Sequence, residues 1–539
     1  MNFDPNSTPF GGETPENSNE PWFLTKKNAH EINYTVRDTV FAWLSVLVCL
    51  ILVRMTPFAQ NTLGAVIGVC LLFLFCGVYF KLSGMRHTAK TIAFGAMILI
   101  FTVGFLTCAN EGLHRLLFLW IVFLLLYWIY TVFQLNGNKV LGEDLLGHAA
   151  RAILVIPARS IGSVFLVLLA KGHNTKGGRI AKTLLWILLG LCCAVIPTVT
   201  VILFLSYDEQ FTSLLDKIFS FDADKIFEWI GDLILAFLFA LVLFGALLGS
   251  RSHHGQTQNE AQSLPKLSCH VVPRALVCAA VTPVLAVYVL FFISQWDYYI
   301  SAFTKTLPET LTYADYAREG FFQLCWVCAI NAVMLLLFNL LIKRTRKERN
   351  PLRTVYSVLI SIFTLILVAT ALSKMLLYID SYGLTRKRVY ASWMILLLAV
   401  CFVIVLIRQI VKRLPMIRLL AISFAVFFGM IAILNVDSMI ASYNVDAYLN
   451  GRLQTVDVEA MAEYEVSSVP ALTELMEALQ KREARTENEQ ALLTQANDSL
   501  WYLREQMDKE ENGFLTFNFP KHRAKRLLKD CHLVAPVTE

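Results

Sequence analysis

The sequence predicts an all-α fold, a polytopic transmembrane helical bundle of about 11 spans followed by a polar helical C-terminal region. Three observations predict it. Of the 539 residues, 56% are hydrophobic and only 16% are charged, whereas a soluble globular chain carries about 25% charged residues. The apolar residues are gathered into long runs, which is typical of segments that cross lipid. The alternating pattern of a membrane barrel is absent, so the runs are expected to be helices.

The composition divides the chain into three regions. Residues 1–37 are polar and have no signal-peptide pattern, and they are predicted to be a disordered N-terminal tail. Residues 38–434 form the predicted multi-span transmembrane domain, and residues 435–539 form the predicted helical C-terminal region. The eleven spans are expected at 39–57, 62–80, 91–108, 114–134, 184–206, 226–249, 275–295, 321–341, 355–377, 390–410 and 416–434.

One further apolar segment, residues 151–170, is difficult to assign. It contains Pro157 and Arg159 near its middle, and a charged side chain is costly in a lipid-exposed helix. We therefore expect this segment to be interfacial or re-entrant. Counting it as a span would reverse the side of every later loop.

The distribution of lysine and arginine predicts the orientation. With eleven spans and a cytoplasmic N-terminus, the inner segments contain 26 of these residues, and Lys343–Arg353 is the densest group. The outer loops between spans contain eight, of which three are the adjacent cations Arg386, Lys387 and Arg388. Inner loops are normally the basic ones, so we expect a cell-membrane protein with a cytoplasmic N-terminus and an extracytoplasmic C-terminus.

The C-terminal region has three helix signals. Ser467 and Ser468 followed by Pro470 predict a helix start before "ALTELMEALQKR". A second helix is expected over Glu487–Lys509, and a third after Phe519-Pro520.

Three stretches carry a family resemblance: "TYADYAREGFFQL" (Thr312–Leu324), "YIDSYGLTRKRVYASW" (Tyr378–Trp393), and the segment Asn435–Leu472 that begins "NVDSMIASYNVD". Together they resemble the bacterial polytopic membrane proteins grouped as domain of unknown function 4173, and the related 4153 group. The resemblance extends from about residue 180 to the end, including Phe517–Leu528, and the first four spans carry little of it. It implies a bacterial cytoplasmic-membrane protein with a helical C-terminal region, and it implies no activity.

The same stretches place ionisable side chains at or just beyond the outer ends of spans. Such groups tend to face a protein interior or a water-filled cavity and to find partners there. The arginines of the outer cluster either form structural ion pairs or bind an external anion in an outer vestibule, and both interpretations stay open. The candidate ligand-binding residues are Asp315, Arg318, Glu319, Lys374, Asp380, Arg386, Arg388 and Asp437.

The weaker candidates have structural interpretations. Asp232 lies four residues after Glu228 inside the sixth predicted span, and a polar patch against a neighbouring helix is favoured over a proton or cation relay. His253, His254 and His270 lack the spacing of a metal site.

No motif for catalysis or cofactor binding is found: there is no Walker loop, zinc-protease pair, nucleophile elbow or kinase signature. The sequence therefore predicts no cofactor and gives no reason to expect an enzyme. Nucleic acid is not an expected partner, because the basic residues follow the membrane topology instead of forming one groove-sized face.

Three functions remain open. The first is binding or transport of a small anionic solute or lipid head group at the outer vestibule. The second is a membrane-anchored interaction or assembly protein, with a protein partner that binds the C-terminal region. The third is a transferase for lipid-linked envelope precursors that would use outward carboxylates and cations. Membrane lipids are expected partners in all three.

Overall fold

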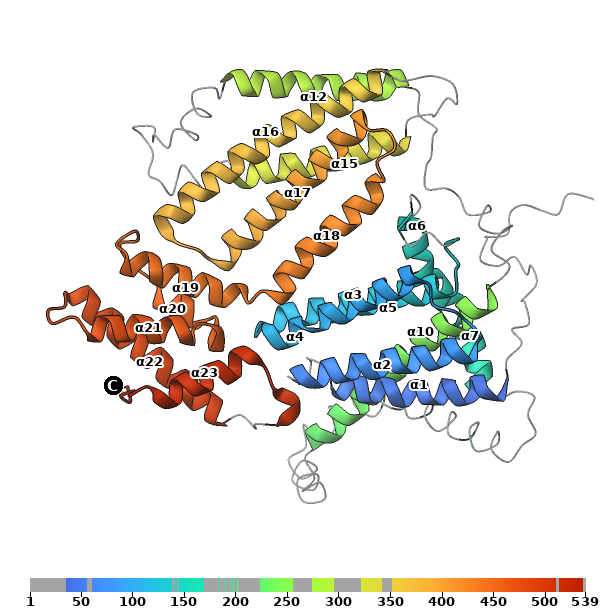
Figure 1. The fold of residues 1–539 in the computed structure, drawn as a ribbon, viewed down its shortest axis with the longest axis horizontal. Coiled ribbons are helices and arrows are strands. Elements are labelled where there is room, and N and C mark those ends of the chain that lie inside the picture. The colour runs from blue at the N-terminus through green and yellow to red at the C-terminus, as the bar shows by residue number, and fades with distance from the viewer. Residues whose placement is uncertain are drawn as a thin grey trace, which may run out of the picture.

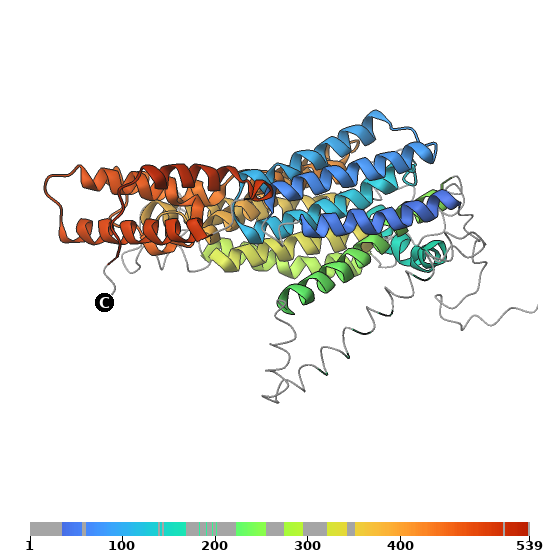
Figure 2. The same cartoon turned by 90° about the horizontal axis from the view of Figure 1, so that it is seen from below.

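The structure, a computed structural model, shows two helix bundles joined by a smaller helical region at the C-terminus (Figures 1 and 2). Every regular element in the described part of the chain is a helix. The described residues are 35–55, 61–137, 141–142, 145–168, 223–254, 274–294, 321–341, 351–509 and 513–536, with five single positions between 183 and 201.

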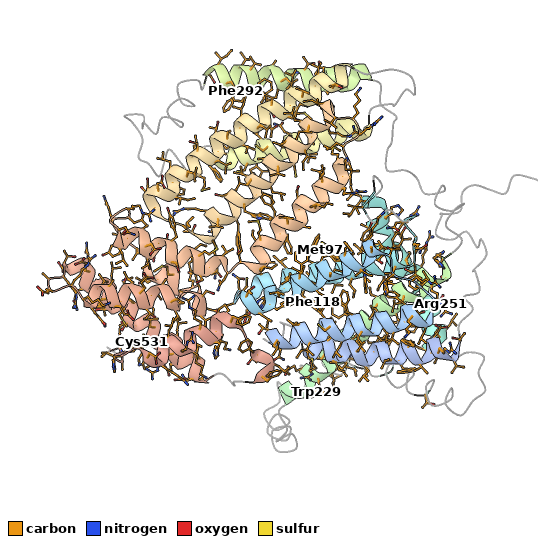
Figure 3. All side chains as sticks on the ribbon, in the orientation of Figure 1. Met97, Phe118, Trp229, Arg251, Phe292 and Cys531 are labelled. Carbon is orange, nitrogen blue, oxygen red and sulfur yellow. The ribbon has the colours of Figure 1, made fainter. Side chains whose placement is uncertain are left out.

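The first bundle packs around an aromatic core. Phe118 lies in this core (Figure 3), and the Tyr79 ring lies edge-on to Phe41 and to Phe244 from two other helices. Its helices are α1 (Val36–Arg54), α2 (Thr62–Leu82), α3 (Ala89–Thr102), α4 (Gly104–Thr107), α5 (Glu111–Val132) and α10 (Ala223–Ser252).

The second bundle has a chain of polar side chains in its interior. The Tyr288 hydroxyl donates to Asn331, and the Asn331 amide donates to the Thr364 hydroxyl, so three helices share one buried chain of hydrogen bonds. Such bonds between apolar helices stabilise their packing in lipid. The helices are α12 (Arg274–Ser294), α15 (Phe321–Leu341), α16 (Pro351–Tyr382), α17 (Arg386–Ile410) and α18 (Met416–Ile433).

Helix α18 connects the two bundles. It packs beside α17, and its Phe424 and Phe428 side chains contact Trp120 of α5. Gly104 of α4 lies against the Ala432 carbonyl, where a Cβ atom would have no room.

The C-terminal region has its own apolar core, built from residues such as Leu472 and Leu500. The helices predicted there are confirmed: α21 covers Val469–Gln480, α22 covers Glu487–Lys509 and α23 covers Phe519–Asp530. The region begins with α19 (Val436–Leu449) and α20 (Val458–Ala462).

Nine helices in the described ranges are long and apolar enough to cross a membrane. They include Leu145–Leu168, which is continuous through α6 (Leu145–Ala150), η2 (Arg151–Val155) and α7 (Ile156–Leu168). Two further predicted spans match α12 and α15, which contain shorter apolar stretches. The predicted span 184–206 lies outside the described residues, apart from single positions. The all-α, polytopic prediction is confirmed.

The helix over Leu145–Leu168 lies across the others in Figure 1. Its Phe165 ring lies beside Phe237 near the middle of α10, and three further contacts lie at one end of the first bundle. The Nδ1 atom of His148 lies 2.8 Å from the hydroxyl oxygen of Tyr130, near the end of α5, and the two groups share a hydrogen bond. Ser160 lies against Gly249 near the end of α10, and the Val167 carbonyl accepts from Thr39 at the start of α1.

The two ends of the bundles are distinct. The distal end holds Asp38, Tyr79 and Arg251, which contact one another. The opposite end, which we call the junction end, holds the C-terminal region, and there Thr62 of α2 donates to the Phe517 carbonyl at 2.7 Å. Residue 38 and the C-terminal region therefore lie at opposite ends of the bundles.

Candidate functional site

A buried ion pair lies where the second bundle meets the C-terminal region. The Nε atom of Arg386 lies 2.7 Å from Oδ1 of Asp437, and its Nη2 atom lies 2.9 Å from Oδ2. Asp437 is 4% exposed, and the Arg386 guanidinium also lies over the Tyr464 ring, 4.6 Å from its centroid. This two-bond geometry is the strong form of an arginine–carboxylate pair.

Local sequence places both partners. Asp437 is in the first turn of α19, whose N-cap Asn435 accepts from the Ser438 amide. A carboxylate is favourable there because the N-terminus of a helix carries partial positive charge. Arg386 is the first residue of α17, and the N-cap Thr385 accepts from the Arg388 amide.

Asn110 extends the pair to the first bundle. Its Nδ2 atom donates to Oδ2 of Asp437 at 3.2 Å, and its Oδ1 atom accepts from the Leu113 amide at the start of α5. The Asp437 carboxylate therefore contacts side chains from both bundles.

The neighbouring cation Arg388 forms hydrogen bonds with the backbone of the turn between α16 and α17. Its Nη1 atom donates to the Tyr382 carbonyl at 2.8 Å and to the Gly383 carbonyl at 2.5 Å, and its guanidinium stacks over Tyr378. These carbonyls belong to the end of α16, where a cation is favourable. Arg388 is therefore engaged by the protein's own backbone.

Asn444 of α19 holds the same turn from the other side. Its amide side chain accepts from the Leu384 amide at 2.7 Å and donates to the Leu384 carbonyl at 2.9 Å. Gly383 has a φ of 73°, and a Cβ atom there would lie 2.6 Å from Oδ1 of Asn444. Glycine is required at this position by both its conformation and its neighbour.

Asn518 and Cys108 attach the C-terminal region to the first bundle. Nδ2 of Asn518 donates to the Phe105 carbonyl at 3.0 Å and to the Cys108 carbonyl at 2.5 Å. The Cys108 thiol is buried and donates to the Ala432 carbonyl at 3.2 Å. We call these contacts and the Arg386–Asp437 pair the polar junction.

The structure brings together only part of the predicted vestibule. Arg386 and Asp437 form the pair, and Arg388 lies in the adjacent turn. Lys374 is buried within α16 at 4% exposure, and Asp380 is exposed in the last turns of the same helix. Asp315, Arg318 and Glu319 lie outside the described residues.

The Asp232 interpretation holds. Nε of Arg54 lies 2.8 Å from Oδ2 of Asp232, and the Arg54 guanidinium stacks over Trp229 at 3.6 Å. This is a polar patch between α1 and α10.

The sequence model of a protein family described as "Domain of unknown function (DUF4153)" matches residues 95–475. The match covers most of the two bundles and reaches into α21. The chain belongs to this family. No curated protein and no solved structure matches the chain.

The matched range of this DUF4153 protein starts within the third predicted span, earlier than the resemblance suggested, and ends before Phe517–Leu528. The polar junction lies partly inside the range: Arg386, Asn444 and Asp437 are within it, whereas Asn518 is beyond it.

The side chains of the polar junction hold segments of the chain together. Within the described residues, no group of three or more His, Cys, Asp or Glu side chains is placed to hold a metal ion. Burial raises the pKa of Tyr464, so this phenol beside the pair stays neutral. Arg386 is neutralised by the Asp437 carboxylate and Arg388 donates to backbone carbonyls, so both side chains hold neighbouring segments together.

The sequence interpretation missed Asn110, Asn444, Asn518 and Cys108. Asn518 had a readable signal, because it directly precedes the predicted third C-terminal helix and asparagine is a preferred N-cap. Asn110 is the N-cap of α5, but the predicted span began only at residue 114. Cys108 and Asn444 had none, since their partners are backbone groups distant in sequence.

Proposed function

We propose that this protein is a multi-pass bacterial cell-membrane protein whose C-terminal helical region acts outside the membrane as an interaction or assembly module. The main support for the proposal is that both Arg386 and Arg388 already have partners within the protein. An anion site would need them to be available, yet one is paired with Asp437 and the other donates to carbonyls of α16. Cations that are used to hold a folded region in place favour a module over a vestibule.

The orientation of this proposal is supported by charge. The N-terminus is cytoplasmic and the C-terminal region extracytoplasmic in it, because the predicted inner segments carry 26 lysines and arginines and the outer loops carry eight. The opposite placement of Asp38 and the C-terminal region agrees with an odd number of spans.

Residues 151–170 are interfacial in this proposal. A helix from His148 to Val167 is about 30 Å long at 1.5 Å per residue. If it crossed the membrane, its two ends would contact opposite ends of the first bundle. Its contacts with Tyr130, Gly249 and Thr39 all lie at the distal end.

Site-specific crosslinking in intact cells tests the module. A photoreactive residue replaces Tyr502, which is 54% exposed on α22, and a matched control replaces Leu74, which is 65% exposed on α2. We expect one dominant protein adduct from position 502, lost when unlabelled C-terminal region competes, and only lipid adducts from position 74. Lipid adducts alone at both positions contradict the proposal.

Binding or transport of an anionic solute or lipid head group is the second candidate, and Lys374 favours it. A buried cation within a membrane helix is by default a candidate functional group. Flux of anionic solutes into vesicles that contain the purified protein, compared with the Lys374→Met variant, tests it. Equal flux with both proteins and with empty vesicles rejects it. The transferase hypothesis gains no observation of its own in the described ranges.

A further inference from the structure

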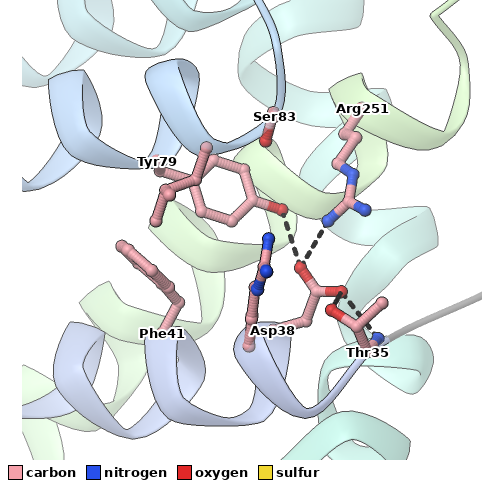
Figure 4. Close-up of a pocket in the computed structure, with 8 residues that line it drawn as sticks. Thr35, Asp38, Phe41, Tyr79, Ser83 and Arg251 are labelled. Carbon is pink, nitrogen blue, oxygen red and sulfur yellow. Dashed lines mark hydrogen bonds and ion pairs between the residues drawn. The ribbon is translucent and has the colours of Figure 1, made fainter.

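A small polar pocket lies at the distal end of the first bundle, away from the polar junction (Figure 4). Its volume is about 110 Å³, and it is lined by residues of α1, α2 and α10 together with Thr35. This is room for roughly three to four waters, which suits one small polar group and excludes a nucleotide. The lining residues are Thr35, Arg37, Asp38, Phe41, Tyr79, Leu82, Ser83 and Arg251.

The only carboxylate among the lining residues is already engaged. Asp38 is 1% exposed, and its Oδ2 atom accepts from the amide of Thr35 at 2.8 Å and from its hydroxyl at 2.9 Å. Its Oδ1 atom lies 2.5 Å from Nη1 of Arg251 and accepts from the Tyr79 hydroxyl at 3.4 Å (Figure 4). One guanidinium therefore neutralises the carboxylate.

A second guanidinium leaves the pocket with net positive charge. Arg37 lines the pocket and is exposed, and it has no ion pair with any other residue that the structure describes. The Arg251 side chain uses one nitrogen for Asp38 and stays 35% exposed. Two guanidinium groups and the Ser83 hydroxyl are donors whose geometry matches the oxygens of a phosphate group.

Exposed apolar side chains lie in and next to the pocket lining. Leu82 lines it at 52% exposure, and Val36 and Val40 flank Arg37 on α1 at 57% and 59%. A free phosphate ion gains nothing from exposed aliphatic side chains, whereas a lipid brings acyl chains that cover them. Basic pockets between membrane helices are suited to anionic head groups.

We propose that this pocket binds the phosphate of an anionic membrane lipid from the leaflet at the distal end. Arg37 supplies the main charge contact, Arg251 and Ser83 supply further donors, and the acyl chains lie along Leu82, Val36 and Val40. The proposal is independent of the C-terminal module and of which side of the membrane is cytoplasmic.

Lipid titration of the purified full-length protein in detergent tests the site. The probes are phosphatidylglycerol, phosphatidylcholine and inorganic phosphate, and retained lipid is counted by native mass spectrometry. Arg37→Gln is the test variant, because Arg37 has no ion pair with a described residue and its removal is expected to leave the fold intact. Arg86→Gln is its matched control, since Arg86 is an exposed arginine at the same end that does not line the pocket.

We expect the wild type and Arg86→Gln to retain phosphatidylglycerol in preference to phosphatidylcholine. Arg37→Gln should weaken phosphatidylglycerol binding by about five-fold, the effect of one interfacial arginine. Equal loss in both variants, or no preference for the anionic lipid, overturns the proposal. Competition by millimolar inorganic phosphate overturns the lipid assignment and makes the pocket a phosphate-ion site.

Discussion

The two ends of the helix bundles hold their cations in opposite ways. At the junction end, Arg386 is bound to Asp437 and Arg388 to the carbonyls of α16. At the distal end, Arg251 neutralises Asp38 while Arg37 stays exposed beside a pocket. At the junction end two arginines fix structure, whereas at the distal end one arginine does so and Arg37 stays exposed. When the predicted topology places an arginine on the outer side, a structural ion pair or hydrogen bond is therefore the first role to test.

Removing the carboxylate at the junction end should have the largest effect. Asp437→Ala leaves the Arg386 guanidinium partly buried without its partner, which should lower the free energy of unfolding by about 3 kcal/mol. Thermal unfolding of the purified protein in detergent measures it. Lys387→Ala is the matched control, because Lys387 is the exposed cation next to Arg386. A loss no larger than that of the control means that the junction end is not held by this pair.

Two glycines allow the ends to be compared directly. Gly84, in the distal turn after α2, and Gly383, in the junction turn after α16, share a φ of 73°. Gly84→Ala should cost about 1 kcal/mol of unfolding free energy, because only the backbone conformation is strained. Gly383→Ala should cost about 2–3 kcal/mol, since its Cβ atom also displaces Asn444 from Leu384. Equal losses in the two variants, measured by thermal unfolding, contradict a tightly packed junction turn.

The asparagine that attaches the C-terminal region should have an intermediate effect. Asn518→Ala removes two buried hydrogen bonds to the first bundle and should cost about 1–2 kcal/mol. Asn497→Ala is the control, because Asn497 makes side-chain bonds with the backbone of Val534 on the exposed surface. Cleavage of the C-terminal region by protease, followed over time, should accelerate only in Asn518→Ala. If cleavage accelerates in both variants, the contacts of Asn518 with the first bundle have no special role in holding the C-terminal region.

The smallest effect concerns pH and a surface carboxylate of the C-terminal region, away from the polar junction. The pKa of Glu489 is lowered because its carboxylate accepts from the Thr486 amide and pairs with Arg482. A lowered pKa gives stability that is present above the unfolded value of about 4.3 and is lost as the pH falls through the folded value. Between pH 6 and pH 3 the unfolding free energy of the wild type should therefore fall slightly more than that of Glu489→Gln. A loss of the same size in the variant contradicts this assignment.

Much of the fold could be predicted because membrane helices are specified locally. The runs at 62–80 and 416–434 contain a single charged residue, Arg418, and each forms one helix whose ends lie within a few residues of the prediction. The helix starts of the C-terminal region follow from local caps and prolines, as at Pro470 and Pro520.

The candidate site could be predicted only in part, because its contacts join distant segments. Arg386 and Asp437 were recognisable as charges at the ends of spans, but their pairing depends on how α19 returns across α17. Asn518 lies 413 residues from the Phe105 carbonyl that it bonds, a relation that no local pattern encodes. The distal pocket was missed because Asp38 and Arg251 meet only after α1 and α10 pack together.

The most direct test of the central claim is the sidedness of the two ends in intact cells. Glu483 is exposed in the C-terminal region and Arg86 is exposed at the distal end, and Glu483→Cys and Arg86→Cys are each made in a background in which Cys269 and Cys531 are replaced by serine. A membrane-impermeant maleimide added to the cells should label position 483 and label position 86 only after lysis. Labelling of position 86 in intact cells, with position 483 protected, would contradict the account.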